Sequence, residues 1–200
     1  MGIDINRVDK AFKVKTEIIE ELEVSMQSGN ITNGKVGYVL SQNSNASVIA
    51  VNKLLANKVE VYRLKNGDFF IKTRDKDQIS LLAKSYNLSF SGTSKNLAKG
   101  SKKLSLPKVG IYKSWKANMD EGWTRWVLEK YHFPLDTLHN QDIINGNLNQ
   151  YSAIIIPSQS GAAILHGYAN NTYPDEYSGG IGLNGTLALK EYAEEGGRII

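Results

Sequence analysis

The stretch KVGIYKSWKANMDEGWTRWVLEKYHFP at residues 108–134 decides the fold of the second half of the chain. Its apolar start at 109–112 predicts a buried strand, and the polar residues that follow predict a loop. Asn118 precedes the next periodic segment and Glu121 stands three residues on, which is the pattern of a helix capped by a capping box. The sequence therefore predicts a strand, a loop and a well-delimited helix.

The apolar residues of this predicted helix share one face. Trp123, Trp126 and Val127 recur at helical spacing. We expect Trp115, Trp123 and Trp126 to be core and interface residues and not a sugar platform, with Trp115 in the loop as the one that faces a partner. Phe133-Pro134 ends the helix, because the residue before a proline avoids helical backbone angles.

A second strand is predicted by YSAIIIPS at 151–158, since three consecutive isoleucines are typical of a strand covered on both faces. A helix is predicted at 186–195, and RII at 198–200 begins another strand. Strands that alternate with helices indicate an α/β domain with a parallel sheet over 108–200. Because a strand begins there, we expect this domain to be truncated at its C-terminus and the polypeptide to continue.

Residues 35–95 predict a smaller α/β unit. Strands are expected at 36–41, 59–64 and 68–73, and helices at 45–58 and 75–90. The Asn66-Gly67 pair predicts a hairpin turn between the last two strands. Residues 1–34 read as an irregular N-terminal segment, and 96–107 as a basic Ser/Gly/Lys linker.

Charge and composition exclude several classes of function. The basic excess is concentrated in the linker, where lysine alternates with serine and glycine and no arginine or aromatic residue provides a base-stacking surface. We therefore expect no nucleic-acid partner. No apolar run reaches the length of a membrane span, so we expect no membrane partner. The chain has no cysteine, which excludes disulfides and thiolate chemistry.

The second half resembles the C-terminal region of large bacterial proteins of the zinc carboxypeptidase (carboxypeptidase A-like) family. That region is similar to class I glutamine amidotransferases and has a flavodoxin-like fold. The resemblance covers roughly residues 108–200 and extends more loosely over 36–107. It rests on Asn118, Asp120, Glu121, Gly122, Trp123, Arg125, Trp126, Pro134, Asp142, Gly146, Pro157, Glu176, Tyr177, Gly179, Gly180 and Gly182.

The resemblance implies a zinc-peptidase parent, whose zinc is held by His-x-x-Glu and a distant histidine. The three histidines of this chain, His132, His139 and His166, do not form that motif. The nearest approach is His139-x-x-Asp142, where Asp142 is better explained as a helix cap. We therefore expect no catalytic residue, no metal ligand and no cofactor in this chain, and a zinc site in the parent's catalytic domain. The family also favours a secreted or periplasmic location.

Polar residues follow two of the predicted strands of the second domain. Lys113, Ser114 and Trp115 come after the first strand, and Ser158 and Gln159 after the isoleucine strand. Open parallel sheets bind ligands outside the carboxyl ends of their strands.

The start of the helix capped by Asn118 should lie close by. These six residues are the candidate site for a small polar ligand or an anion. The alternative interpretation is that they cap their elements and face solvent or a partner domain.

Three functions follow from these observations. The first is a non-catalytic accessory or interaction domain that packs against, or recruits substrate to, the catalytic domain of the same parent polypeptide. The alternative is an independent binding module for a small polar or saccharide ligand. The third is a degenerate hydrolase, for which an activated serine would be the sign.

Overall fold

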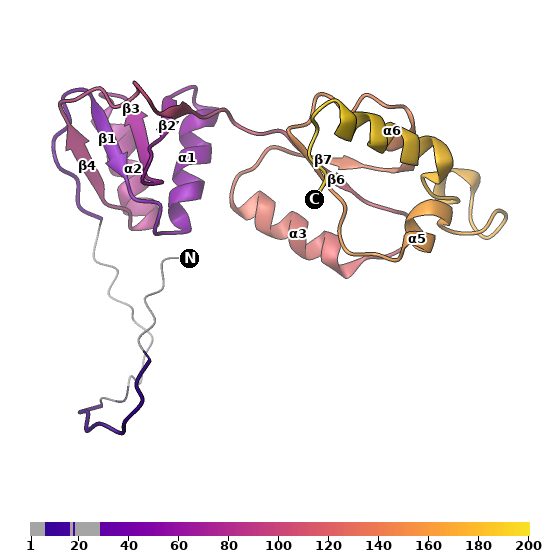
Figure 1. Ribbon diagram of the computed structural model, residues 1–200, viewed down its shortest axis with the longest axis horizontal. Helices are drawn as coiled ribbons and strands as arrows, with labels where there is room; N and C mark the ends of the chain where they lie inside the picture. The colour runs from indigo at the N-terminus through magenta and orange to yellow at the C-terminus, as the bar shows by residue number, and fades with distance from the viewer. Residues whose placement is uncertain (1–6, 17, 19–28) are drawn as a thin grey trace. The chain divides into compact units, whose positions relative to one another are not determined.

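The computed structural model describes residues 7–16, 18 and 29–200, and the chain divides into two compact units between Leu104 and Ser105. This boundary falls inside the segment 96–107 that the sequence suggests as a linker. Residues 7–16 contain no helix or strand. The remainder of the predicted irregular segment, residues 1–6, 17 and 19–28, lies outside the described residues. Figure 1 shows the elements of each unit.

The first unit contains a five-stranded sheet in which every neighbouring pair is antiparallel. The strand order is β4-β1-β3-β2-β5. Its first four strands and two helices form the split β-α-β arrangement of ferredoxin-like domains. The strands are β1 (Gly37–Leu40), β2 (Glu60–Arg63), β3 (Phe69–Lys72), β4 (Phe90–Thr93) and β5 (Lys102–Lys103).

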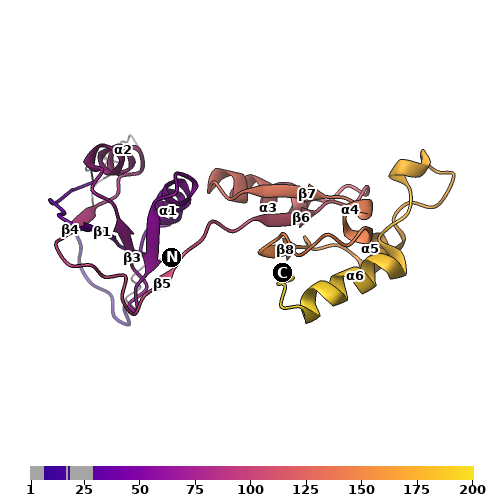
Figure 2. The same ribbon diagram turned by 90° about the horizontal axis from the view of Figure 1, so that it is seen from above.

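Two helices, α1 (Ala46–Ala56) and α2 (Lys76–Tyr86), cover one face of this sheet (Figure 2). Leu54 of α1 and Ile79 of α2 are fully buried against Val61 of β2, as the periodicity of the sequence predicts. The side chain of Asp75 accepts a hydrogen bond from the Gln78 amide (2.9 Å) and caps the start of α2.

Two strands of the first unit are not evident in the sequence. Asn87 adopts a left-handed conformation (φ 50°) and ends α2, so Phe90 continues as β4 instead of completing the predicted helix. Within the expected linker, β5 pairs with β2, and the Leu104 amide donates to the Val61 carbonyl (2.9 Å). Local composition does not reveal such a pairing, because it depends on an edge strand 40 residues away.

The second unit contains a three-stranded parallel sheet in the order β7-β6-β8. The chain end pairs with β8 in parallel, through a bridge between Ile154 and Ile199. The mixed α/β class and the parallel character predicted from the sequence are confirmed, whereas β7 was not predicted. The strands are β6 (Val109–Tyr112), β7 (Leu135–Leu138) and β8 (Ala153–Ile155).

Helices lie on both faces of this sheet (Figure 2). On one face, Tyr192 of α6 is buried together with Ile143 of α4 and Tyr112 of β6. Because side chains alternate along a strand, the buried Ile111 points to the opposite face, where α3 lies. The helices are α3 (Met119–Lys130), α4 (Asn140–Ile144), α5 (Gly161–His166) and α6 (Gly182–Glu194), with a 3₁₀ turn η1 (Asp175–Tyr177).

The orientation of α3 differs from the expectation. Asn118 caps the helix as predicted, since its Oδ1 accepts from the Asp120 amide (2.9 Å). Glu121, however, is buried and accepts a hydrogen bond from Arg125 Nε (2.8 Å). Trp123 and Trp126 share a face, but they are 62% and 53% exposed and are not core residues. The inward side of α3 carries Glu121 together with the partly buried Thr124, Arg125 and Leu128.

The first testable prediction concerns Glu60, which joins three strands of the first unit. Hydrogen bonds from Lys103 (2.6 Å) and Lys72 (2.8 Å) lower the pKa of Glu60 from 4.5 to about 2. The ionised form is therefore favoured by folding, and its stabilising effect is present above pH 4.5 and is lost as the pH falls toward about 2.

We expect the E60Q variant to be less stable than the wild type at pH 7 and to approach it at pH 2–3, by thermal unfolding followed with circular dichroism. The exposed Asp77 on α2 provides the control variant D77N. A stability difference between wild type and E60Q that does not change between pH 7 and pH 2 would contradict the role of the ion pairs.

Candidate functional site

The loops after β6 and β8 meet at the carboxyl edge of the parallel sheet. Gln159 Nε2 donates to Ser114 Oγ (2.9 Å), and Asn118 Nδ2 donates to the Ser158 carbonyl (3.2 Å). These contacts bring together residues that lie 45 and 40 positions apart in the chain. The structure thus places the two predicted groups of site residues side by side.

The reason for this convergence is the pairing of β6 with β8. Ile111 pairs in parallel register with Ile155, so both strands end at the same level. The chain leaves β6 toward β7 on one side and returns to β8 on the other, which makes the space between their loops a topological switch point.

Trp115 forms an aromatic wall beside these contacts. Its ring stacks on His139, with centroids 4.0 Å apart and planes at 7°, and the ring of Tyr177 meets it edge-on at 4.9 Å. His139 Nδ1 donates to the Lys113 carbonyl (2.8 Å), because a carbonyl oxygen can only accept. The imidazole is therefore held in one orientation, and it holds the indole ring in place.

Beneath the loops, a buried hydrogen-bonded chain connects β6 to the segment before α6. Tyr112 donates its hydroxyl proton to Asn140 Oδ1 (2.7 Å), and Asn140 Nδ2 donates to the Gly179 carbonyl (3.0 Å). Burial raises the pKa of Tyr112 to about 12, so the phenol remains a donor throughout the neutral range. This chain positions the segment that carries Tyr177.

The loop after β6 encloses a pocket of about 190 Å³. Lys113 and Lys116 provide positive charge, and the Lys116 ammonium lies 5.4 Å from the centre of the Tyr168 ring. Glu121 provides a carboxylate that is 8% exposed, and both of its hydrogen bonds from Arg125 reach Oε1. The pocket is lined by Lys113, Ser114, Trp115, Lys116, Ala117, Asn118, Glu121 and Tyr168.

Five of the six predicted residues lie at this site through side-chain atoms or the pocket lining, and Ser158 lies there through its carbonyl oxygen. The arrangement can bind a small ligand with both hydrogen-bond donors and acceptors. The ammonium groups of Lys113 and Lys116 can pair with a carboxylate or phosphate of a ligand. The carboxylate of Glu121 can accept hydrogen bonds from ligand hydroxyl groups, and the aromatic rings can pack against the apolar face of a sugar.

Two serine hydroxyls at this edge have structural partners. Ser114 Oγ donates to the Lys116 carbonyl (3.0 Å) and accepts from Gln159, while Ser160 Oγ accepts from the Ala163 amide (3.2 Å) at the start of α5. Within the described residues, no group of three or more His, Asp or Glu side chains is arranged to hold a metal. Residues 7–16, 18 and 29–200 therefore do not offer the His and Glu ligand set of a carboxypeptidase zinc site.

Four residues of the site were missed by the sequence reasoning: Glu121, His139, Tyr168 and Tyr177. His139 directly follows β7, so recognising LDTL as a strand would have placed it at the same edge. Glu121 had been interpreted as part of a capping box. Tyr168 and Tyr177 come from an irregular segment whose course no local pattern predicts.

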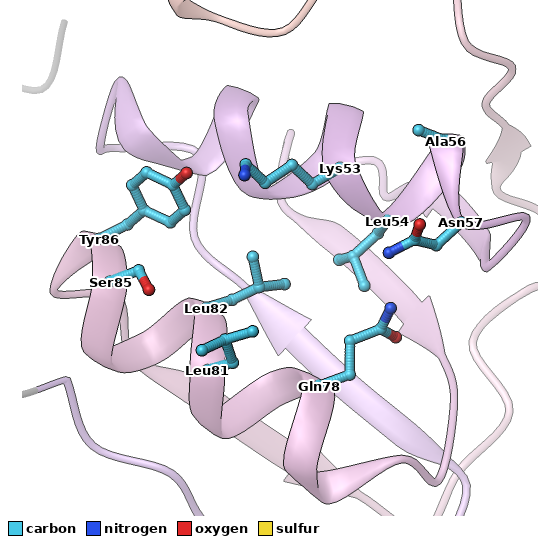
Figure 3. Close-up of a pocket in the computed structure, with 9 residues that line it drawn as sticks. All are labelled: Lys53, Leu54, Ala56, Asn57, Gln78, Leu81, Leu82, Ser85 and Tyr86. Carbon is cyan, nitrogen blue, oxygen red and sulfur yellow. The ribbon is translucent and has the colours of Figure 1, made fainter.

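A second hollow, of about 310 Å³, lies between α1 and α2 of the first unit (Figure 3). Leu54, Leu81 and Leu82 line it together with the polar ends of Gln78 and Asn57. Lys53 reaches across it, and its ammonium lies 5.7 Å from the centre of the Tyr86 ring. This hollow is a groove between packed helices, with less convergence of polar groups than the edge of the parallel sheet.

Comparison with protein families, with curated proteins and with solved structures finds no match to this chain. Within the part that the structure describes, none of the helices has the length and apolar character that crossing a membrane requires.

The second prediction tests the buried support of the site. Replacing Asn140 with alanine leaves the hydroxyl of Tyr112 without an acceptor, so we expect N140A to lower the free energy of unfolding by about 1–3 kcal/mol in urea. Near-ultraviolet circular dichroism of the aromatic cluster should weaken at the same time.

The matched control is the double variant Y112F/N140A, which removes both partners. Its loss of stability should be smaller than the sum of the two single losses, because the unpaired hydroxyl is gone. Strictly additive losses would show that Tyr112 and Asn140 do not depend on one another.

Proposed function

We propose that this chain is a non-catalytic accessory domain of a zinc carboxypeptidase-like protein, and that it binds a small polar ligand at the carboxyl edge of its parallel sheet. The observation that carries the proposal is that Ser114 and Asn118, which line one pocket, are hydrogen-bonded to Gln159 and Ser158 of the neighbouring loop. Its parent family is supported by the sequence resemblance alone. In this proposal the zinc and the peptidase chemistry belong to the parent's catalytic domain.

A flavodoxin-like, amidotransferase-like fold for the second unit belongs to the same proposal. The order β7-β6-β8, followed by the pairing of Ile154 with Ile199, is the strand order 2-1-3-4. Flavodoxin-like sheets have this order and bind their ligand at the switch point between strands 1 and 3. Here these strands are β6 and β8, which supports the position of the pocket.

The ligand class follows from the pocket walls. A volume of about 190 Å³ suits a molecule of the size of one sugar ring or one amino acid. Lys113 and Lys116 are placed for a carboxylate, and Glu121 accepts hydrogen bonds from hydroxyl or ammonium groups. In the accessory role, the ligand is part of the substrate that this domain recruits to the parent's catalytic domain.

The same pocket supports a second candidate, an independent small-polar-ligand or saccharide binding module. The two candidate functions differ in whether binding of the ligand to the pocket changes the rate of a peptidase. If saturating the pocket changes the carboxypeptidase rate of the parent polypeptide, the accessory role is supported; an unchanged rate favours the independent module.

The third prediction is that small polar ligands perturb this edge selectively. In ¹H–¹⁵N spectra titrated with glucose, N-acetylglucosamine, alanine and inorganic phosphate, at least one ligand should shift the amides of residues 113–118 and 158–160. The W115A variant should weaken that binding about tenfold, because one aromatic contact contributes roughly 1–1.5 kcal/mol. The matched control W123A removes a tryptophan that lies outside the pocket and should bind as the wild type does.

Two results would count against a ligand site here. One is the absence of selective shifts with all four ligands at tens of millimolar. The other is an equal loss of binding in W115A and W123A, which would indicate a nonspecific effect on the fold.

A further inference from the structure

The outward face of α3 forms an apolar surface on the second unit. Met119, Trp123 and Trp126 are 77%, 62% and 53% exposed, and Val127 beside them is 44% exposed. These residues recur at the spacing of one helical face, with Gly122 among them. We call Met119, Gly122, Trp123, Trp126 and Val127 the α3 surface.

The middle of this surface is apolar because Glu121 and Arg125 face inward, whereas Asp120, Glu129 and Lys130 are exposed near the two ends of α3. Glu121 is buried and paired with Arg125, whose side chain is 22% exposed. A helix that buries its polar pair and exposes two tryptophans reverses the usual amphipathic arrangement. Large exposed aromatic side chains gathered on one face are typical of a protein interaction site.

The α3 surface is shaped as both a protrusion and a hollow. Met119, Gly122, Trp123 and Trp126 line a hollow of about 400 Å³. Gly122 has no side chain to occupy this hollow, and a Cβ at that position would meet no atom within 4 Å. Trp126 is itself one of the lining residues, with its ring edge-on to Trp123 at 6.1 Å between centroids and the Lys130 ammonium 5.0 Å from its centre. A second copy of the same helix thus presents a side chain that fits the hollow.

We propose that the α3 surface binds the α3 surface of a second copy of this chain, with the two helices antiparallel. In the two-fold register, Trp126 of each copy enters the hollow beside Gly122 of the other. In this register residue 119 of one copy lies opposite residue 129 of the other, so Met119 comes close to Lys130 of the partner copy. The contact is isologous, so one surface serves both copies.

Charge complementarity selects the antiparallel orientation. Asp120 lies in the first turn of α3 and Lys130 in the last turn. Antiparallel packing brings the Lys130 ammonium of one copy to the Asp120 carboxylate of the other at both ends, and it opposes the two helix dipoles. Parallel packing would place like charges together at each end.

The area is sufficient for a reversible dimer. Given their exposed fractions, the two tryptophans, Met119 and Val127 present on the order of 500 Å² of apolar surface per copy. The two copies together therefore reach roughly the 1,000 Å² that specific interfaces require. An interface of this size predicts weak, concentration-dependent association.

The experiment is sedimentation velocity on the full chain from about 5 µM to about 1 mM. We expect a reversible monomer–dimer equilibrium with a dissociation constant on the order of tens of micromolar. The W126S variant should weaken it at least tenfold, because it removes the side chain that fills the hollow.

G122L should weaken association to the same extent, because its own side chain fills the hollow. This variant also separates dimerisation from folding, since leucine has a higher helix propensity than glycine and its Cβ has free space. The matched control is L183S, which removes a leucine that is 73% exposed on α6 and should leave the equilibrium unchanged.

Cysteine cross-linking tests the orientation directly, because the chain contains no cysteine. Mixed M119C and K130C copies should form the heterodimeric disulfide in preference to either homodimer. The proposal is overturned if the wild type stays monomeric up to about 1 mM. It is also overturned if L183S alone dissociates the dimer, or if each cysteine variant cross-links only with itself.

Discussion

The buried ion pair between Glu121 and Arg125 marks the side of α3 that faces the interior of the second unit. A charge can be buried only with a partner, and removing one member of a buried pair typically costs about 3–5 kcal/mol. Glu121 is buried with Arg125 as its partner on the side of α3 that faces the sheet, beside the partly buried Leu128. The opposite side of α3, with Trp123 and Trp126, is left in solvent. The same carboxylate forms part of the pocket wall, so one interaction relates the fold, the candidate site and the α3 surface.

The central strand β6 supplies the second constraint. It pairs with β7 on one side and with β8 on the other, and the polypeptide reverses its direction of winding between them. The loop that follows β6 forms a pocket with Glu121 and Tyr168, and the loop that follows β8 contacts it through the hydrogen bond between Gln159 and Ser114. The buried contact between Tyr112 and Asn140 keeps the surrounding segment in place. A rigid strand pair with polar loops at its end is a common basis for small-molecule recognition.

The two surfaces of the second unit have different chemistry. At the carboxyl edge, charged and polar groups surround a small pocket that suits a small polar molecule. On α3, apolar groups cover a broader surface that suits another protein surface. Asn118 and Glu121 contribute to the former, and Met119 and Trp123 to the latter, so neighbouring residues of one helix serve both.

Local sequence patterns determined the strands at 109–112 and 153–155, the start of α3 at Asn118, and the α/β class, because these depend on apolar runs and capping residues. They also predicted that the residues after the first strand and after the isoleucine strand would lie close together, since parallel strands end at one edge. Tertiary structure alone decided that Trp123 and Trp126 face solvent, because periodicity shows that residues share a face but not which way the face points. It also decided the pairing of β5 with β2 and the stacking of Trp115 on His139. Those contacts join segments far apart in sequence, so they stabilise the protein only once the sheets have brought these segments together.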